Sequence, residues 1–332
     1  MTPVRTSTFS TDDLSIDVPL VADAIEQTIR QQVRGLRRRG LVVGLSGGVD
    51  SSVVTCLSVR AIGAERVQVL LMPERDSSSE SLTLGRLLCG KLGVTPVVED
   101  ITPILAAAGC YEKQLEAIRT AFPEYDERYR CKITLPSILD SDRLNVSELT
   151  IESPGGERKT SRLSAAAYQQ CIAATNYKQR VRKMTEYYHA DRLNYAVAGT
   201  PNRLEYDQGF FVKLGDGAAD LKPIAHLYKS QVYALAAHVG VPEDISRRPP
   251  TTDTFSMPQT QEEFYFALPY DKMDACLYGR NHDVPAQDVA AAIGLTAEQV
   301  ERVYRDIDQK RRTTRYLHLK PLLVEPVAEI GD

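Results

Sequence analysis

The stretch that decides the fold runs from Leu41 to Ser52 and reads LVVGLSGGVDSS. Its first six residues form a mostly apolar run, which is typical of a strand buried in a parallel sheet. Glycine and serine follow, and a helical pattern then continues through Val59. A glycine-rich turn between a buried strand and a helix brings backbone N–H groups and the positive end of the helix dipole together. The stretch therefore predicts an anion-binding loop at the edge of a sheet.

The same alternation of strand and helix continues on both sides of this loop. Helical patterns occupy 20–37 and 79–92, and strand-like runs occupy 67–72, 95–99 and 194–200. This rhythm predicts an α/β fold, a doubly wound parallel sheet with flanking helices. Beyond residue 223 helical patterns dominate, so we expect a helical C-terminal portion with helices at 227–239, 261–278 and 296–309.

The rhythm breaks between residues 104 and 176. A helical stretch at 112–122 is followed by polar-apolar segments on both sides of Pro154-Gly155-Gly156, which reads as a hairpin turn. A helix is expected again over 176–191. We interpret 115–170 as an inserted, hairpin-containing subdomain of a single domain that spans 1–325.

The composition narrows the class of protein. The chain has 332 residues, with 40 basic against 44 acidic side chains and a net charge of -4, which disfavours a nucleic-acid coat or a polybasic membrane binder. No apolar run approaches the ~20 residues of a membrane span. The first residues do not resemble a signal peptide. The six cysteines include no C-x-x-C pair, so reduced thiols and a cytoplasmic location are expected.

Asp50 is the unusual member of the loop. A carboxylate would be repelled by a bare phosphate, so its position predicts a divalent cation, Mg²⁺, between the two. The hydroxyls of Ser46, Ser51 and Ser52 add donors for an anion. No Gly-Lys-Ser/Thr follows, so this is not the Walker A pattern. A tight strand-to-helix turn that Asp50 caps is the structural alternative.

The loop resembles the pyrophosphate-binding loop of the N-type ATP pyrophosphatases, which cleave ATP between its α and β phosphates and adenylate a carboxylate or carbonyl. The resemblance implies an adenine nucleotide alpha hydrolase-like fold with ATP as substrate. It also implies that the loop binds ATP through Gly44, Leu45, Ser46, Gly47, Gly48, Val49, Asp50, Ser51 and Ser52. The loop alone does not choose among the members of this superfamily.

A second stretch does choose. Residues 199–229 read GTPNRLEYDQGFFVKLGDGAADLKPIAHLYK, which resembles the signature region of the ammonia-dependent NAD synthetases. That signature is GT-x-N-(K/R)-x-E, a Gly-aromatic pair, K-x-GDG-x-AD-x-x-P and a further lysine. The segments NYKQRVRKM at 176–184, PTTD at 250–253 and YDKMD at 270–274 match the same family. The resemblance covers roughly 20–110 and 175–315.

The resemblance implies a role for each matching residue. It implies Asp50, Lys229 and Thr251 as catalytic residues, with Thr200, Lys229 and Thr251 completing the ATP site. Asp50 and Glu205 would hold Mg²⁺. The acid substrate would be bound by Arg180, Lys213, Asp216, Asp220 and Lys310.

Chain position supports part of this assignment. Thr200 and Glu205 follow a strand, so they lie at the carboxyl edge of the sheet, where ligands bind in open α/β folds. A carboxylate there, facing Asp50, supplies the hard oxygen ligands that Mg²⁺ prefers. Lys229 and Thr251 can stabilise charge on departing pyrophosphate. An ordinary surface role is the alternative for each of these residues, and it is left open for Arg182 and Lys183.

The implied reaction is ATP-dependent amidation: deamido-NAD and ammonia give NAD, AMP and pyrophosphate through an acyl-adenylate. The family also implies a homodimer that completes the acid-substrate site across a two-fold interface. Only about 40 residues precede the loop, so no glutaminase domain is expected. Free ammonia or a separate glutaminase would supply nitrogen, with no nucleic acid or membrane as partner.

Three features depart from the family pattern. About 70 residues separate Pro103 from Asn176, where the family has roughly 30; Gln179 replaces an alanine, and Gln309 a histidine. The insertion can be ornament, a reshaped acid pocket, or a lid that excludes water from the acyl-adenylate. Alternatives are therefore the same chemistry on another carboxylate in a specialised pathway and an inactive ATP-binding homologue. A tRNA-modifying enzyme is disfavoured by the absence of a basic domain.

Overall fold

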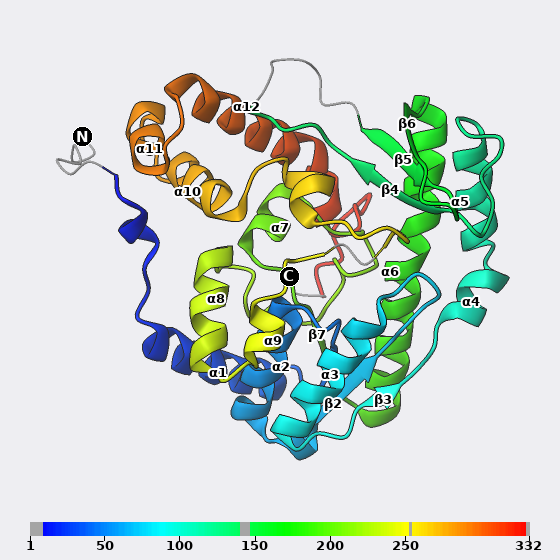
Figure 1. Cartoon of the computed structure of the whole chain (residues 1–332). Helices are drawn as coiled ribbons and strands as arrows, with labels where there is room; N and C mark the ends of the chain where they lie inside the picture. The colour runs from blue at the N-terminus through cyan, green and yellow to red at the C-terminus, as the bar shows by residue number, and fades with distance from the viewer. Residues whose placement is uncertain (1–8, 140–146, 252–253, 330–332) are drawn as a thin grey trace.

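A four-stranded parallel sheet organises the first part of the chain (Figure 1). The computed structural model describes residues 9–139, 147–251 and 254–329. The sheet has the order β3-β2-β1-β7, with β1 paired to β2 on one side and to β7 on the other. Its strands are β1 (Leu41–Gly44), β2 (Val67–Leu71), β3 (Val97–Val98) and β7 (Ala196–Ala198). The chain order reverses at β1, which makes the carboxyl ends of β1 and β7 the expected ligand-binding point.

Both faces of this sheet are covered, as the apolar strands predict. Leu41 and Val43 belong to a core with α1, α2, α3 and α8, whereas Val42 and Val197 belong to a core with α4, α5 and α6. The doubly wound α/β fold is therefore confirmed. The bounds of these helices are α1 (Val18–Gly35), α2 (Val49–Ile62), α3 (Ser79–Leu92), α4 (Thr102–Ala107), α5 (Cys110–Arg119), α6 (Ala165–Leu193) and α8 (Lys229–His238).

The C-terminal portion builds a second, helical core. The expected helix at 261–278 is wrong as a single element: a short π-helical turn, η3 (Glu262–Phe266), ends at Ala267 with φ 55°, and Pro269 then starts the next helix. Proline cannot continue the preceding helix because it lacks an N–H and restricts the residue before it. The remaining helices are α7 (Arg203–Gln208), α9 (Glu243–Ser246), α10 (Tyr270–Asn281), α11 (Ala286–Ile293) and α12 (Ala297–Thr314), with 3₁₀ turns η1 (Thr11–Leu14), η2 (Ala64–Arg66) and η4 (Arg315–His318).

A three-stranded antiparallel sheet, in the order β4-β5-β6, occupies the expected insertion. Its strands are β4 (Arg130–Thr134), β5 (Glu148–Glu152) and β6 (Arg158–Arg162). The expected hairpin joins β5 to β6, and Gly156 in its turn has φ 83°. The helix expected at 176–191 begins earlier, at Ala165, because Ser164 caps it by accepting a hydrogen bond from the amide of Ala167. Residues 165–170 therefore belong to α6.

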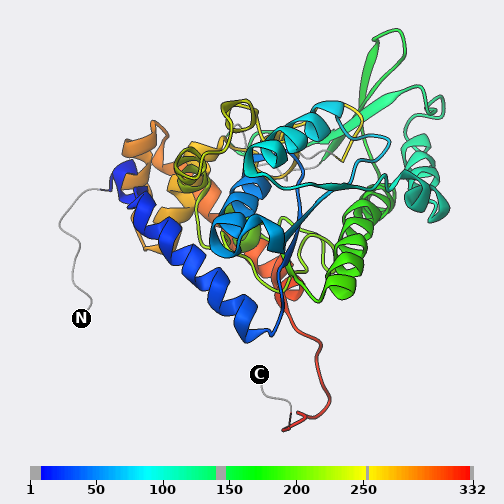
Figure 2. The same ribbon diagram turned by 90° about the horizontal axis from the view of Figure 1, so that it is seen from below.

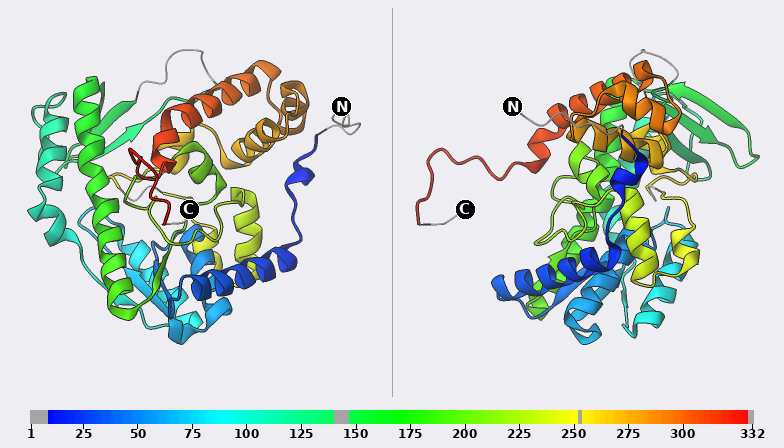
Figure 3. Two further views of the ribbon diagram at one scale, coloured as in Figure 1. Left: turned by 180° about the vertical axis from the view of Figure 1, so that it is seen from behind. Right: turned by 90° about the vertical axis from the view of Figure 1, so that its left-hand side faces the viewer.

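Two segments extend from the body in opposite directions (Figures 2 and 3). One is the β5–β6 hairpin, and the other is the C-terminal stretch after η4. Leu322 and Val324 in that stretch are exposed to solvent. In the part of the chain described, no helix is both long and apolar enough to cross a membrane. The six cysteines are buried free thiols.

Candidate active site

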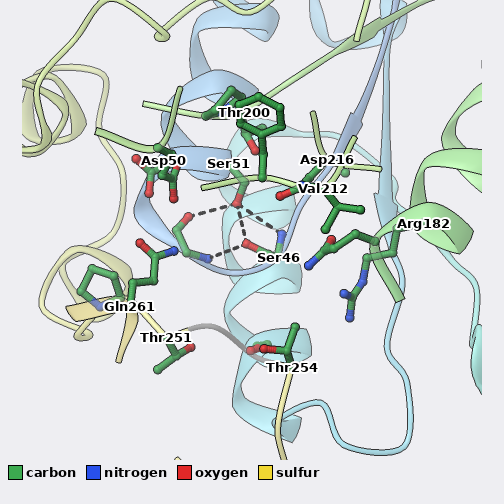
Figure 4. Close-up of a pocket in the computed structure, with 18 of the residues that line it drawn as sticks. Ser46, Asp50, Ser51, Arg182, Thr200, Val212, Asp216, Thr251, Thr254 and Gln261 are labelled. Carbon is green, nitrogen blue, oxygen red and sulfur yellow. Dashed lines mark hydrogen bonds between the residues drawn. The ribbon is translucent and has the colours of Figure 1, made fainter. Parts of the chain in front are cut away.

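The glycine-rich loop joins the end of β1 to the start of α2. The hydroxyl of Ser51 accepts a hydrogen bond from the amide of Ser46 (3.2 Å), and the two hydroxyls lie 3.0 Å apart (Figure 4). Gly48 is the N-cap residue of α2 and has no side chain that could cap the helix. The first N–H groups of a helix have no partner within it. The loop therefore leaves donors available to an anion, as the sequence predicts.

Gly47 is required by the backbone. Its φ is 79°, and a Cβ there would lie 2.6 Å from the carbonyl oxygen of Ser81. The loop consequently passes close to the first turns of α3. No side chain fits at this position unless the backbone moves. The backbone geometry therefore requires glycine at position 47.

Asp50, in the first turn of α2, is held from two sides. Its Oδ2 lies 2.5 Å from Nζ of Lys229, and its Oδ1 accepts a hydrogen bond from the Asn202 side chain at 3.0 Å. Lys229 is fully buried at the start of α8. Its backbone N–H and that of Ser230 donate to the carboxylate of Asp274, which caps α8. Lys229 of α8 is thereby held in place against Asp50 of α2.

Glu205 lies beside this pair. It is in the first turn of α7, where it forms a capping box with Asn202. Burial, and then the negative charge of Asp50, raise the pKa of Glu205 to about 8, although Lys229 acts in the opposite direction. The negative charges of Asp50 and Glu205 thus act on each other, and the positive charge of Lys229 does not fully offset them. This is the pair that the sequence predicts as metal ligands.

The loop and Glu205 line a cavity of about 440 Å³ at the carboxyl ends of β1, β2 and β7. Figure 4 shows Ser46, Asp50, Thr200, Asp216 and Thr251 around the same space. The predicted residues that line the cavity are Gly44, Leu45, Ser46, Gly48, Val49, Asp50, Ser51, Thr200, Glu205, Asp216 and Thr251. Three residues predicted to bind ATP do not line the cavity: Gly47, Ser52 and Lys229. Gly47 and Ser52 belong to the loop that lines it, where the Ser52 hydroxyl donates to the carbonyl of Gly48. Lys229 contacts the lining residue Asp50.

The other residues predicted for the acid substrate lie away from this cavity. Arg180 is on the exposed side of α6 and donates to the carbonyl of Lys213, whose Nζ in turn donates to the carbonyl of Tyr316. Asp220 accepts a hydrogen bond from the amide of Val197 in β7. Lys310 donates to the carbonyl of Tyr265. None of these four predicted residues lines the cavity. Lys310 is next to the lining, because its partner Tyr265 is a lining residue.

A family model described as NAD synthase matches residues 21–144 and 141–316. The chain belongs to the NAD synthase family. It is 60% identical over 320 residues to the NH(3)-dependent NAD(+) synthetase of Mesorhizobium japonicum, a match that covers 96% of this chain and 99% of the relative.

Solved structures agree with this NAD synthase assignment at the level of fold. The NH3-dependent NAD synthetase of Campylobacter jejuni, solved with a nitrate ion, is 22% identical with a TM-score of 0.61; the match covers 93% of this chain and 100% of that one. The NMN synthetase of Francisella tularensis is 19% identical with a TM-score of 0.58, covering 94% and 100%. The NAD synthase fold is therefore confirmed.

Several cavity residues of this NAD synthase were not assigned from sequence. Arg182 lines the cavity and makes no hydrogen bond or ion pair with the residues described. Lys183 and Glu186 also line it as a buried ion pair of 2.6 Å, next to Gly44. Arg248 lines it as well and donates to the hydroxyl of Ser81. One sequence signal for Arg182 is its spacing from Gln179. Residues three apart lie on the same face of a helix, and both residues line the cavity.

The carboxylates fit a magnesium ion. Within the described ranges, no group of three or more His, Cys, Asp or Glu residues gathers to bind a metal. Mg²⁺, however, is commonly bound by one or two carboxylates together with substrate phosphates and water. Asp50 and Glu205 provide such a pair. Burial, and then the charge of Asp50, raise the pKa of Glu205, and a bound cation would favour its ionised form.

Proposed function

We propose that this protein is an ammonia-dependent NAD synthetase: it converts deamido-NAD, ATP and ammonia into NAD, AMP and pyrophosphate. The observation that carries the proposal is the Asp50–Lys229 pair at the mouth of the anion loop, beside Glu205. The relative that shares 60% of its residues over nearly its whole length has this activity in its name.

ATP would lie with its phosphates on the loop after β1. The free N–H groups of the first turn of α2 and the hydroxyl of Ser46 would donate to the β and γ phosphates. Lys229 and Thr251 would neutralise charge as pyrophosphate separates. Arg182, unpaired and directed into the cavity, is suited to a further anionic oxygen.

The chain's task in the first step is to bring a carboxylate to the α-phosphorus. One carboxylate oxygen of the acid forms a bond to that phosphorus while the bond to the β-phosphate oxygen breaks, which gives an acyl-adenylate and pyrophosphate. Ammonia then attacks the acyl carbon, and AMP leaves with the oxygen that the acid contributed. The adenylate is needed because hydroxide is a poor leaving group.

Asp50 and Glu205 would hold Mg²⁺, which supplies charge neutralisation at the phosphates when it is bound. Asn202 orients both carboxylates, since its side chain donates to Asp50 and its backbone N–H donates to Glu205. Lys229 holds the second oxygen of Asp50 through an ion pair of 2.5 Å.

A homodimer is the proposed working assembly. Its support is an exposed face on which Met184 (56% exposed) and Tyr188 (62% exposed) lie one turn apart on α6. Arg180, on the same helix, donates to the carbonyl of Lys213. The next residue, Leu214, is also exposed. Exposed apolar side chains that gather on one face are candidates for an interaction surface. A second copy covering this face would bring Arg180 and Lys213 to an interface, as the family resemblance implies.

Free ammonia is the proposed nitrogen donor, and the cytoplasm the proposed location. The same fold occurs in an NMN synthetase, so the fold alone does not select the acid. The Mesorhizobium relative matches 96% of this chain, an extent that includes most of the inserted segment. The insertion is therefore no argument for a different acid.

The test is a panel of acids assayed with ATP, Mg²⁺ and ammonium, in which AMP and amide are measured together. Deamido-NAD should give NAD and AMP in equal amounts and should be preferred over nicotinate mononucleotide. Preference for the mononucleotide, or for an unrelated carboxylate, would contradict the assignment. An Asp50→Asn variant is the control for contaminating ATPase activity.

A further inference from the structure

Thr254 has a buried hydroxyl with no assigned task. It lines the cavity, and its Oγ1 has no hydrogen-bond partner among the residues described (Figure 4). Buried polar groups are nearly always hydrogen-bonded, because leaving one unpaired costs its desolvation free energy. An unpaired hydroxyl on a residue that lines a ligand cavity can therefore gain its missing partner from a bound ligand.

The backbone of Thr254 is held by a buried lysine of α6. Nζ of Lys178, on α6, donates to the carbonyl oxygen of Thr254 at 2.9 Å. The same ammonium group contacts Glu74 at 2.9 Å and Asp76 at 2.7 Å. The Lys178 side chain is fully buried. A buried ammonium with three oxygen acceptors is satisfied at every donor, which makes it a rigid support.

This cluster is itself braced. Tyr111 donates its hydroxyl to Glu74 at 2.9 Å, and the Arg75 guanidinium lies over the Tyr111 ring and pairs with Asp76. Burial would raise the pKa of Asp76, but Lys178 and Arg75 outweigh it and hold that pKa below its ordinary value. Asp76 therefore remains a charged partner of Lys178 across the neutral range.

The inserted sheet supports the residues that follow Thr254. Strand β4 is bonded to them along its edge: the amide of Met257 donates to the carbonyl of Cys131 at 3.0 Å, and the hydroxyl of Ser256 accepts from the amide of Cys131 at 3.0 Å. The side chain of Gln259 donates to the carbonyl of Ile133. The insertion thus contributes an edge strand to which the cavity wall is attached.

The same wall returns to Thr251. Thr251 and Thr260 form an antiparallel bridge, and the amide of Gln261 donates to the carbonyl of Pro250 at 3.1 Å. Described residues of β4, β5 and β6 do not line the cavity themselves. The inserted sheet is consequently placed to support the wall of the cavity rather than to cover its entrance.

We propose that the Thr254 hydroxyl binds ATP in this cavity, that Lys178 is a positioning residue which holds Thr254 there, and that the inserted sheet exists to support this segment. The proposal rests on the proposed ATP-dependent function. It assigns a ligand contact and a support that the anion loop does not provide.

The experiment compares steady-state constants for ATP and deamido-NAD in the unmodified enzyme and in two variants of Thr254. Thr254→Val removes the hydroxyl and keeps the shape, and it should raise the KM for ATP about tenfold with little change in the KM for deamido-NAD. Thr254→Ser keeps a hydroxyl and should stay within about twofold of the unmodified enzyme. An unchanged KM for ATP in Thr254→Val, or a rise confined to the KM for deamido-NAD, would overturn the contact.

The positioning role is tested by combining variants. Lys178→Met should raise the KM for ATP in the unmodified chain but should add little in the Thr254→Val background, because both changes remove the same contact. Full additivity of the two effects would overturn the positioning role. Glu74→Gln/Lys178→Met keeps the local charge balanced, since Arg75 still pairs with Asp76, and replaces Lys178→Met if that variant does not fold.

The proposed function and the proposed role of Thr254 can be disproved independently. If the unmodified enzyme makes no AMP from ATP and deamido-NAD, the ligase assignment is wrong. If it does so and Thr254→Val behaves like it, only the present inference is wrong. Calorimetric titration of ATP alone into the same proteins gives a second readout, in which Thr254→Val should lose about tenfold in affinity.

Discussion

Nζ of Lys229 lies 2.5 Å from Oδ2 of Asp50, although the two residues are 179 positions apart in the chain. The contact joins α8 to α2 at the point where the anion loop ends. The other carboxylate oxygen of Asp50 accepts a hydrogen bond from the Asn202 side chain. The Asp50 carboxylate is therefore held at both oxygens before any substrate binds.

Lys229→Met should lower kcat for AMP formation by about 100-fold or more, because it removes the cation that faces Asp50 and departing pyrophosphate. Lys91→Met is a matched control, since Lys91 is exposed, lies outside the cavity lining and donates to the carbonyl of Gly240. Pre-steady-state formation of AMP measures the step. Equal kcat values for the two variants would show that Lys229 has no part in adenylation.

The Mg²⁺ requirement should depend on pH through Glu205. Its pKa is raised to about 8, so a proton competes with the metal below that pH. The Mg²⁺ concentration for half-maximal rate should rise as pH falls from 8.5 toward 6.5, by up to about tenfold per unit. Glu205→Gln should be much less active and should lose this dependence. A metal requirement that stays constant with pH in the unmodified enzyme would argue against Glu205 as a ligand.

Two adjacent glycines should respond differently to alanine. Gly47→Ala places a Cβ 2.6 Å from the carbonyl of Ser81 at a positive φ, and should lower the free energy of unfolding by about 1–3 kcal/mol. Gly48→Ala meets only the hydroxyl of Ser46 at 3.4 Å, with φ −89°. It should leave the free energy of unfolding nearly unchanged, as measured by urea denaturation. Equal losses would mean that the loop is not strained at Gly47.

The exposed face of α6 should control assembly. Met184→Glu/Tyr188→Glu should shift the mass seen by light scattering at micromolar concentration from dimer to monomer, because charge would be buried in the interface. The KM for deamido-NAD should rise at least about tenfold, with ATP binding retained. Leu87→Glu, on α3 at 44% exposure, is the control. A dimer that survives the double substitution would locate the interface elsewhere.

The strands and the anion loop could be predicted because their signals are local. The run before Gly44 and the glycine pair after Ser46 lie within ten residues of one another, and period and turn chemistry decide such a segment. Asp50, Glu205 and Thr251 could be placed together because each follows a strand edge or matches a family motif. All three line the cavity.

The support behind the site could not be predicted in this way. Lys178 resembles a surface lysine in sequence, and its burial depends on Glu74 and Asp76, more than 100 positions away. The attachment of residues 256–259 to β4 is likewise a long-range pairing with no local signature. By contrast, α11 was missed although Pro285 precedes it and Gly294 ends it, which are ordinary helix boundaries.

The adenylation step is tested by labelling the carboxylate of deamido-NAD with ¹⁸O and determining where the label goes after turnover with ATP, Mg²⁺ and ammonium. Attack of the carboxylate on the α-phosphorus predicts one ¹⁸O atom in each AMP, none in pyrophosphate, and one retained in the amide of NAD. Label in inorganic phosphate or pyrophosphate, or AMP without label, would contradict an acyl-adenylate and with it the roles given to Asp50 and Lys229.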